Sequence, residues 1–186
     1  MVAWAFELAE HLLREPLPRR WVHVQGVADR ARSVSVLFST DDATLLVEAA
    51  VLHDIGYSPA LALTGFHPLD GARYLREATS PERLCALVAH HSCSYLEARL
   101  RGLSKELDEW GDEETSLRDA LWWADMTTTP DGERTNINDR IEEIQNRYGP
   151  TDLVTAFIAE AKPELTAAVE RTEERLRAAG LAHLAK

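Results

Sequence analysis

Apolar side chains recur at intervals of three or four residues along most of this chain, the spacing that places them on one face of an α-helix. Trp4, Leu8 and Leu12 form one such stripe near the amino terminus, and the segment 137–148 carries another. No segment shows the alternation of apolar and polar residues that marks a half-buried β-strand. A helical period without a strand period predicts an all-α fold, in which apolar helix faces pack around a common core.

Prolines and glycines divide this helical pattern into segments, because proline interrupts a helix and glycine commonly follows its last turn. We expect Asp41 or Asp42 to cap the third helix and Pro163 to kink the last one. An acidic connector, 105–114, precedes the sixth helix. The predicted helices span residues 1–13, 21–38, 43–54, 68–78, 81–92, 115–126, 137–148 and 151–180.

The composition of the 186 residues, 45% apolar and 27% charged, is that of one folded domain, 1–186. The 31 acidic residues outnumber the 20 basic ones, and the net charge of −11 argues against a nucleic-acid-binding surface, which needs basic patches. The amino-terminal segment lacks the basic start of a signal peptide, and no apolar run is long enough to cross a bilayer. With two cysteines, Cys85 and Cys93, and no CxxC motif, we expect a cytoplasmic protein without membrane partners.

The stretch AAVLHDIGYS, residues 49–58, places an imidazole and a carboxylate side by side at the end of an apolar segment. Burying His53 and Asp54 among aliphatic residues is unfavourable unless each finds a polar partner, which a helix cap, an ion pair or a metal ion would provide. Other histidines and an aspartate also lie within or at the ends of apolar helices, at intervals too long for a local metal-binding motif. Together they form the ordered series His23, His53, Asp54, His67, His90, His91 and Asp125.

Members of this series also have ordinary structural explanations. His23 fits a hydrogen-bonded core histidine, His67 fits a helix edge before a proline, and Asp125 fits the partner of an arginine. Such explanations require a separate partner for every buried polar group, whereas one shared metal centre satisfies them all. Imidazole and carboxylate ligands suit iron, manganese, zinc, nickel or cobalt rather than calcium. Six such side chains match two ions, and Asp54, beside His53, is the natural bridge between them.

The order of these residues resembles that of the HD-domain superfamily of metal-dependent phosphohydrolases, an all-α fold, in its HDIG type. The resemblance rests on His23 in RWVHVQGVA, on AAVLHDIGY, and on Asp125 in LWWADM. It covers roughly residues 19–129 as the core of the domain and leaves a C-terminal helical extension, 137–180, outside. The further motifs GFHPLDGARYL and LVAHHS are similar to those of the dinuclear branch of the superfamily.

The resemblance implies two divalent transition-metal ions and assigns their ligands. The first ion would be held by four residues: His23, His53, Asp54 and Asp125. The second ion would share Asp54 and add His67 with one of His90 or His91. We favour His91, because it follows Val88 by three residues, as in relatives with a single histidine there. Asp54 and His90 are the expected catalytic residues, with His90 donating a proton or facing the substrate.

By the same resemblance, the expected activity is hydrolysis of a nucleotide or another small phosphate ester by metal-activated water. The expected partner is therefore a small phosphorylated molecule. Two alternatives share the same ligand set. One is a mixed-valent di-iron oxygenase acting on a phosphonate or polyol, and the other is a non-catalytic binding or sensor module that retains its metal.

The chain departs from the best-known dinuclear relatives, the HD-GYP-like proteins. Tyr57 stands where those proteins carry a lysine, and HSCSYLEA replaces their Gly-Tyr-Pro motif, so specificity for a cyclic dinucleotide is not expected. QGVADR also replaces a short basic motif of phosphohydrolase relatives. The substrate-binding residues therefore stay open. The sequence also leaves the oligomeric state open. The candidate phosphate-binding arginines are Arg19, Arg20, Arg30, Arg73 and Arg134.

Other conspicuous residues are expected to have structural roles. Trp110, Trp122 and Trp123 are interpreted as packing residues rather than a base-stacking platform, and Cys93 as a small buried residue. The segment TTTPDGERTN, 127–136, is interpreted as an ordinary loop rather than a cover over the substrate.

Overall fold

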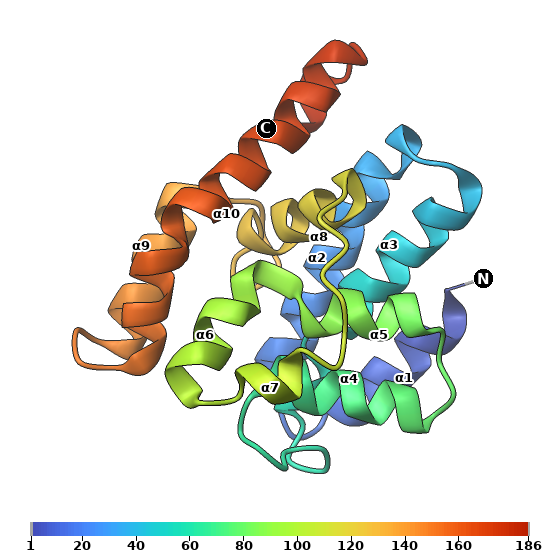
Figure 1. Cartoon of the computed structure of the whole chain (residues 1–186). Helices are drawn as coiled ribbons and strands as arrows, with labels where there is room; N and C mark the ends of the chain where they lie inside the picture. Colours follow the sequence, from blue (N-terminus) through green and yellow to red (C-terminus); the bar gives the residue numbers. More distant parts are fainter. Residues whose placement is uncertain (1, 186) are drawn as a thin grey trace.

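Helices form every regular element of residues 2–185, the part of the chain that this computed structural model describes (Figure 1). The ten α-helices of this part confirm the predicted all-α fold, and its β-bridge between Thr128 and Arg134 is isolated. The short 3₁₀ helices are η1 (Ser35–Leu37), η2 (Ile55–Tyr57), η3 (His91–Cys93) and η4 (Ala182–Ala185). The α-helices are α1 (Ala3–Leu13), α2 (Pro18–Val34), α3 (Thr40–Leu52), α4 (His67–Glu77), α5 (Glu82–Ala89), α6 (Ser94–Arg101), α7 (Ser104–Leu107), α8 (Ser116–Met126), α9 (Ile137–Tyr148) and α10 (Leu153–Ala178).

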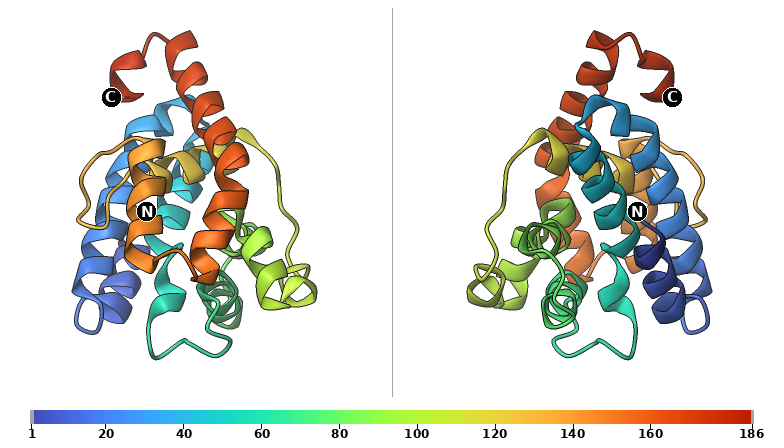
Figure 2. Two further views of the ribbon diagram at one scale, coloured as in Figure 1. Left: turned by 90° about the vertical axis from the view of Figure 1, so that its left-hand side faces the viewer. Right: turned by 90° about the vertical axis from the view of Figure 1, so that its right-hand side faces the viewer.

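Three helices, α2, α3 and α8, form the centre of the bundle, and each packs against the other two (Figure 1). α1 packs on α3, while α4 and α5 lie against each other and reach the centre through contacts of α5 with α3. On the opposite side of α8, the long helix α10 runs past the centre and carries α9 and α6 beside it (Figure 2). The carboxyl-terminal helices therefore cover the central bundle rather than forming a separate body.

α8 lies within the core and is buried from Leu117 to Met126. Trp122 and Trp123 are fully buried and Trp110 nearly so, which confirms their predicted packing role, and Cys93 is buried as well. Because α2, α3 and α10 surround α8, the carboxylate of Asp125 in its last turn is held in place by the core.

Two local predictions were wrong. Ser39 caps α3 in place of Asp41 or Asp42, because its side chain accepts a hydrogen bond from the backbone N–H of Asp42. Trp4 lies at the edge of α1, 38% exposed, with its indole N–H donating to Glu48. The buried face of α1 consists of Ala5, Ala9, Leu12 and Leu13. The acidic connector also contains the short helix α7, which the sequence analysis did not predict.

α10 is the longest helix and runs as one helix with Pro163 inside it. Asp119 of α8 ties the two helices together, because its buried carboxylate accepts hydrogen bonds from Arg171 and Arg175 of α10. Within residues 2–185, no helix has both the length and the apolar character needed to span a membrane.

Candidate metal centre

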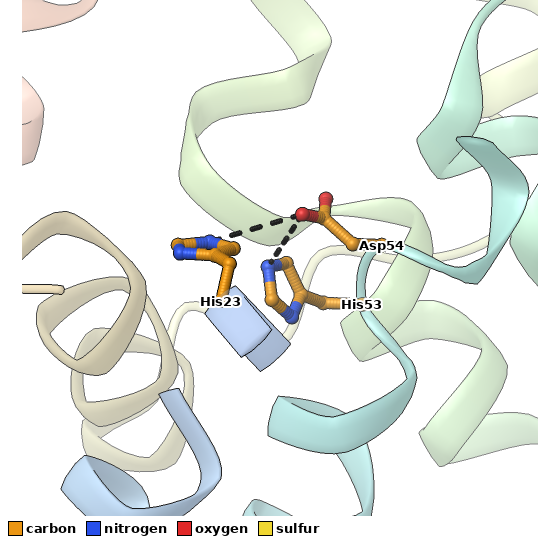
Figure 3. Close-up of side chains that lie close together, drawn as sticks. All are labelled: His23, His53 and Asp54. Carbon is orange, nitrogen blue, oxygen red and sulfur yellow. Dashed lines mark ion pairs between the residues drawn. The ribbon is translucent and has the colours of Figure 1, made fainter. Parts of the chain in front are cut away.

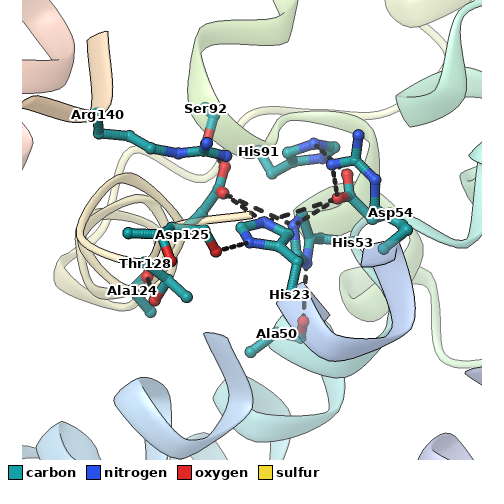
Figure 4. Close-up of polar contacts among 12 residues, drawn as sticks. His23, Ala50, His53, Asp54, His91, Ser92, Ala124, Asp125, Thr128 and Arg140 are labelled. Carbon is teal, nitrogen blue, oxygen red and sulfur yellow. Dashed lines mark hydrogen bonds and ion pairs between the residues drawn. The ribbon is translucent and has the colours of Figure 1, made fainter. Parts of the chain in front are cut away.

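The six side chains predicted as metal ligands converge from five elements on one site. Five of them are buried, and Figure 4 shows these five: His23, His53, Asp54, His91 and Asp125. They come from α2 (His23), the end of α3 (His53 and Asp54), the start of α4 (His67), η3 (His91) and the last turn of α8 (Asp125). Residues separated by up to about one hundred positions in the sequence therefore meet at the centre of the bundle.

The first group of ligand atoms surrounds one oxygen of Asp54 (Figure 3). Asp54 Oδ2 lies 3.3 Å from His53 Nε2 and 3.8 Å from His23 Nε2. The ligand atoms of these three residues lie within 4.8 Å of one another, close enough to share one ion. Asp125 approaches the same two nitrogens, with Oδ1 3.2 Å from His23 Nε2 and 3.8 Å from His53 Nε2.

The second group surrounds the other oxygen of Asp54. Asp54 Oδ1 lies 3.3 Å from His67 Nε2 and 3.9 Å from His91 Nε2, and these two nitrogens are 3.1 Å apart. The three ligand atoms again lie within 4.8 Å of one another. Asp54 thus presents one oxygen to each group, which is the arrangement that a bridging carboxylate requires.

Main-chain carbonyl groups orient three of the four histidines so that Nε2 faces the site. Each Nδ1 faces a carbonyl oxygen: that of Ala50 for His53 at 2.7 Å, that of Val88 for His91 at 2.7 Å, and that of Thr129 for His23 at 2.9 Å. Because a carbonyl oxygen only accepts, each Nδ1 carries the proton and donates it. Each Nε2 therefore keeps a lone pair directed at the site, as in histidines that bind metals.

A divalent transition metal fits this set of donors. His53 Nε2 is buried without a hydrogen-bond partner, although it faces the carboxylates of Asp54 and Asp125. A lone pair beside buried carboxylate oxygens is unfavourable unless a proton or a cation lies between them. Imidazole nitrogens together with carboxylate oxygens are the donors that iron, manganese, zinc, nickel and cobalt accept.

Electrostatics favour the metal-binding protonation states of Asp54 and His91, whereas at His53 the effect of burial is outweighed by Asp54 and Asp125, which raise its pKa. Burial opposes ionisation of Asp54, yet Arg20, whose NH1 lies 2.6 Å from Oδ2, and His53 hold the pKa of Asp54 well below its usual value. Burial, together with the neighbouring His53 and His67, lowers the pKa of His91 to about 3. Ionised aspartate and neutral histidine are the forms in which these residues bind a metal.

The glycine of AAVLHDIGYS permits the close approach that places His67 beside Asp54. η2 packs on α4, and a Cβ on Gly56 would lie 2.0 Å from the carbonyl oxygen of His67 and 2.6 Å from the backbone nitrogen of Gly71. Real Cβ atoms essentially never approach other atoms within 3.0 Å. Any side chain at position 56 would therefore push η2 away from α4 and separate the second group of ligands.

A pocket leads from these ligands to α9 and α10. Its inner end is lined by Asp54, His67, His91 and Asp125 together with Arg20, and its outer wall by residues of the two helices. The Arg20 guanidinium stacks over the Tyr57 ring at 4.1 Å, and that ring stacks on His67 at 3.8 Å. This stack of three side chains fixes the orientation of His67, the one histidine without a carbonyl partner among the four.

Two residues of this pocket were missed by sequence reasoning. Ser92, at a positive φ of 48°, donates from Oγ to Asp125 Oδ2 at 2.6 Å and so orients that carboxylate. Arg140 of α9 is buried, lines the pocket, and has an Nε without a hydrogen-bond partner. Figure 4 shows the Arg140 side chain reaching toward Asp125 and Ser92. Arginines on buried and on exposed helix faces recur at the same spacing, so the position of Arg140 in the sequence did not indicate that its side chain is buried in the site.

His90 lies outside both ligand groups. Its Nε2 is 2.8 Å from the carbonyl oxygen of Trp110, and its own carbonyl accepts a hydrogen bond from Trp122 Nε1 at 3.0 Å. It is not among the residues that line the pocket. The structure therefore places His91, rather than His90, among the groups that could hold a metal.

One of the five candidate phosphate-binding arginines, Arg20, lines the pocket. Arg19 and Arg73 form ion pairs away from it, and Arg30 is buried against the main chain of residues 184–185. The segment 127–136 forms a loop, and its main chain contributes the Thr129 carbonyl that orients His23.

Comparison with known proteins gives a match to one family. The family model described as HD domain matches residues 20–130, a segment that contains all six candidate ligands. No curated protein and no solved structure matches the chain. α9 and α10, which form the outer wall of the pocket, lie beyond the matched segment.

Proposed function

Because this chain belongs to the HD domain family, we propose that it is a metal-dependent phosphohydrolase acting on a nucleotide or another small phosphate ester. One observation carries the proposal: Asp54 directs one carboxylate oxygen to each of two groups of histidine nitrogens. This arrangement supports two divalent ions bridged by Asp54. The candidate metals are iron, manganese, zinc, nickel and cobalt.

When bound, such ions activate water as a nucleophile and neutralise charge on phosphoryl oxygens. The side chains of the protein hold and orient the participants. Asp54 and Asp125 supply the anionic ligands, and Ser92 keeps the Asp125 carboxylate in one orientation through its hydrogen bond.

Arg20 and Arg140 are the proposed phosphate-binding residues. Both line the pocket, and guanidinium groups match the geometry of phosphate oxygens. Arg140 Nε is a buried donor without a partner, and a phosphate oxygen would supply one. Arg20 already lies beside Asp54 and is held there by stacking on Tyr57. We leave His90 out of the proposed machinery, because its Nε2 is engaged with the Trp110 carbonyl.

The direct test is metal-dependent hydrolysis by the whole chain. Protein purified without added metal is loaded separately with each candidate ion and assayed for phosphate release. The panel contains nucleoside monophosphates, sugar phosphates and aryl phosphates, each with and without oxygen. We expect turnover that needs metal and does not need oxygen.

Matched variants locate the activity. His53→Ala and Asp54→Ala should each lose metal and turnover while the helical circular dichroism signal persists. His11→Ala, which removes an exposed histidine of α1, should keep both. Turnover that requires oxygen would identify an oxygenase instead, and a metal-loaded protein without turnover would identify a binding module. Either result contradicts the proposal.

A further inference from the structure

The outer wall of the pocket contains a cluster of apolar side chains, although charged residues crowd the inner end and also lie on α9. Arg140, Ile144, Arg147 and Tyr148 follow one another along one face of α9 and line the pocket. α10 adds three apolar side chains to this wall: Val154, Phe157 and Ile158. Ile144, Phe157 and Ile158 are buried, so the wall is part of the folded core and not a flexible surface.

We propose that, among the phosphate esters covered by the proposed function, this wall selects those whose organic part is a compact hydrocarbon group, alkyl or aryl, over nucleotides, sugar phosphates and glycerol phosphate, whose phosphate is attached to a polyol. The proposal deepens the proposed function and rests on it, because it takes the phosphate to lie at the inner end. α9 and α10 lie outside the segment that matches the family, so the selection is a property of this chain's own extension.

Two of the polar side chains beside these apolar residues, Ser94 and Glu97, are already engaged. Ser94 Oγ donates to the carbonyl oxygen of Ala89, and the Glu97 carboxylate pairs with Arg101 at 2.7 Å. Ile144, Val154, Phe157 and Ile158 offer no side-chain donor or acceptor. Hydroxyl groups of a polyol placed against them would lose their water without gaining partners, which is unfavourable.

The wall also limits the size of the organic group. The cavity volume of the pocket is about 70 Å³. Arg147, which pairs with Glu143 and lies 5.0 Å from the centre of the Tyr148 ring, narrows the space beside α9. A hydrocarbon group of a few carbon atoms therefore suits the pocket better than a long chain.

A matched pair of phosphonates tests this selection without depending on turnover. Butylphosphonate and 3,4-dihydroxybutylphosphonate have the same chain and differ by two hydroxyl groups. We expect the metal-loaded protein to bind butylphosphonate at least about tenfold more tightly in an anaerobic calorimetric titration. Equal affinity, or tighter binding of the dihydroxy compound, overturns the inference.

Variants attribute the preference to the wall. Val154→Thr adds a hydroxyl to the wall at nearly constant volume and should reduce the preference about threefold or more. Val36→Thr makes the same change at an exposed position of η1 and should leave the preference unaltered. If both variants keep the wild-type preference, the wall is not its source.

Methylphosphonate distinguishes a failure of the apolar selection from a failure of the phosphate site. If it binds and butylphosphonate binds no more tightly, the apolar selection fails while the phosphate site stands. If no phosphonate binds the metal-loaded protein, the phosphate site of the proposed function fails, and the inference fails with it.

Discussion

Replacing Gly56 by alanine tests how the second group of ligands is assembled. The added Cβ would lie 2.0 Å from the carbonyl oxygen of His67 and 2.6 Å from the backbone nitrogen of Gly71, where real Cβ atoms stay at least 3.0 Å away. The obstructing atoms belong to the main chain of α4, so no side chain can rotate to make room. η2 and α4 must therefore separate by about 1 Å, the difference between 2.0 and 3.0 Å.

This separation affects both stability and metal binding. Overpacking of this kind costs roughly 1–3 kcal/mol of unfolding free energy, and each kcal/mol lowers Tm by about 2–4 °C in a chain of this size. The same movement takes His67 away from Asp54, so binding at the second group weakens more than binding at the first. Thermal unfolding and metal titration measure the two effects.

Gly111→Ala is the matched control, because a Cβ at that position meets nothing within 4 Å. We expect it to retain both the Tm and the metal stoichiometry of the wild type. If Gly56→Ala behaves like Gly111→Ala in both measurements, the packing argument for Gly56 is refuted.

Three further substitutions test other contacts. Ser92→Ala removes the hydrogen bond to Asp125 and should weaken metal binding about 10- to 100-fold in a chelator competition, and unchanged affinity would contradict this role. Arg140→Gln should lower kcat/KM for a phosphate ester about tenfold or more at unchanged metal content, and an unchanged kcat/KM would exclude phosphate binding by this residue. Asp119→Asn should lower the unfolding free energy at neutral pH by about 1–2 kcal/mol, measured by urea denaturation, because two half-exposed arginines of α10 lose their partner. Burial opposes ionisation of Asp119, yet these arginines lower its pKa. The stabilisation from the ionised Asp119 is therefore complete above the unfolded pKa of 3.8 and is lost as the pH falls through the folded pKa. The variant should lack this acid-side loss, and equal acid sensitivity in both proteins would contradict the pairing.

Most helices could be predicted from the sequence, because apolar spacing and proline positions act locally. The helix expected over 115–126 is α8, and the helix expected over 137–148 is α9. The cap of α3 could not be predicted with the same certainty, since serine and aspartate both cap helices well. Ser39 is the N-cap because α3 begins at Thr40, two residues before the start that a cap at Asp41 would give.

The candidate ligands could be found in the sequence because buried polar groups need partners, and a shared ion supplies them at one place. Their supporting contacts could not be found. The carbonyl groups of Ala50 and Thr129 orient histidines through main-chain atoms, which carry no residue-specific signal. Arg140 joins the site from α9 only through tertiary packing, and the sequence alone does not distinguish it from the surface arginines around it.

Metal content per chain tests the central claim most directly. The protein is purified without added metal and titrated with each candidate ion. Its bound metal is then measured by inductively coupled plasma mass spectrometry. We expect two transition-metal ions per wild-type chain, and a loss of both in Asp54→Ala, because its carboxylate faces both groups of ligands. A wild-type chain that binds no transition metal, or an Asp54→Ala variant that retains both ions, would contradict the account.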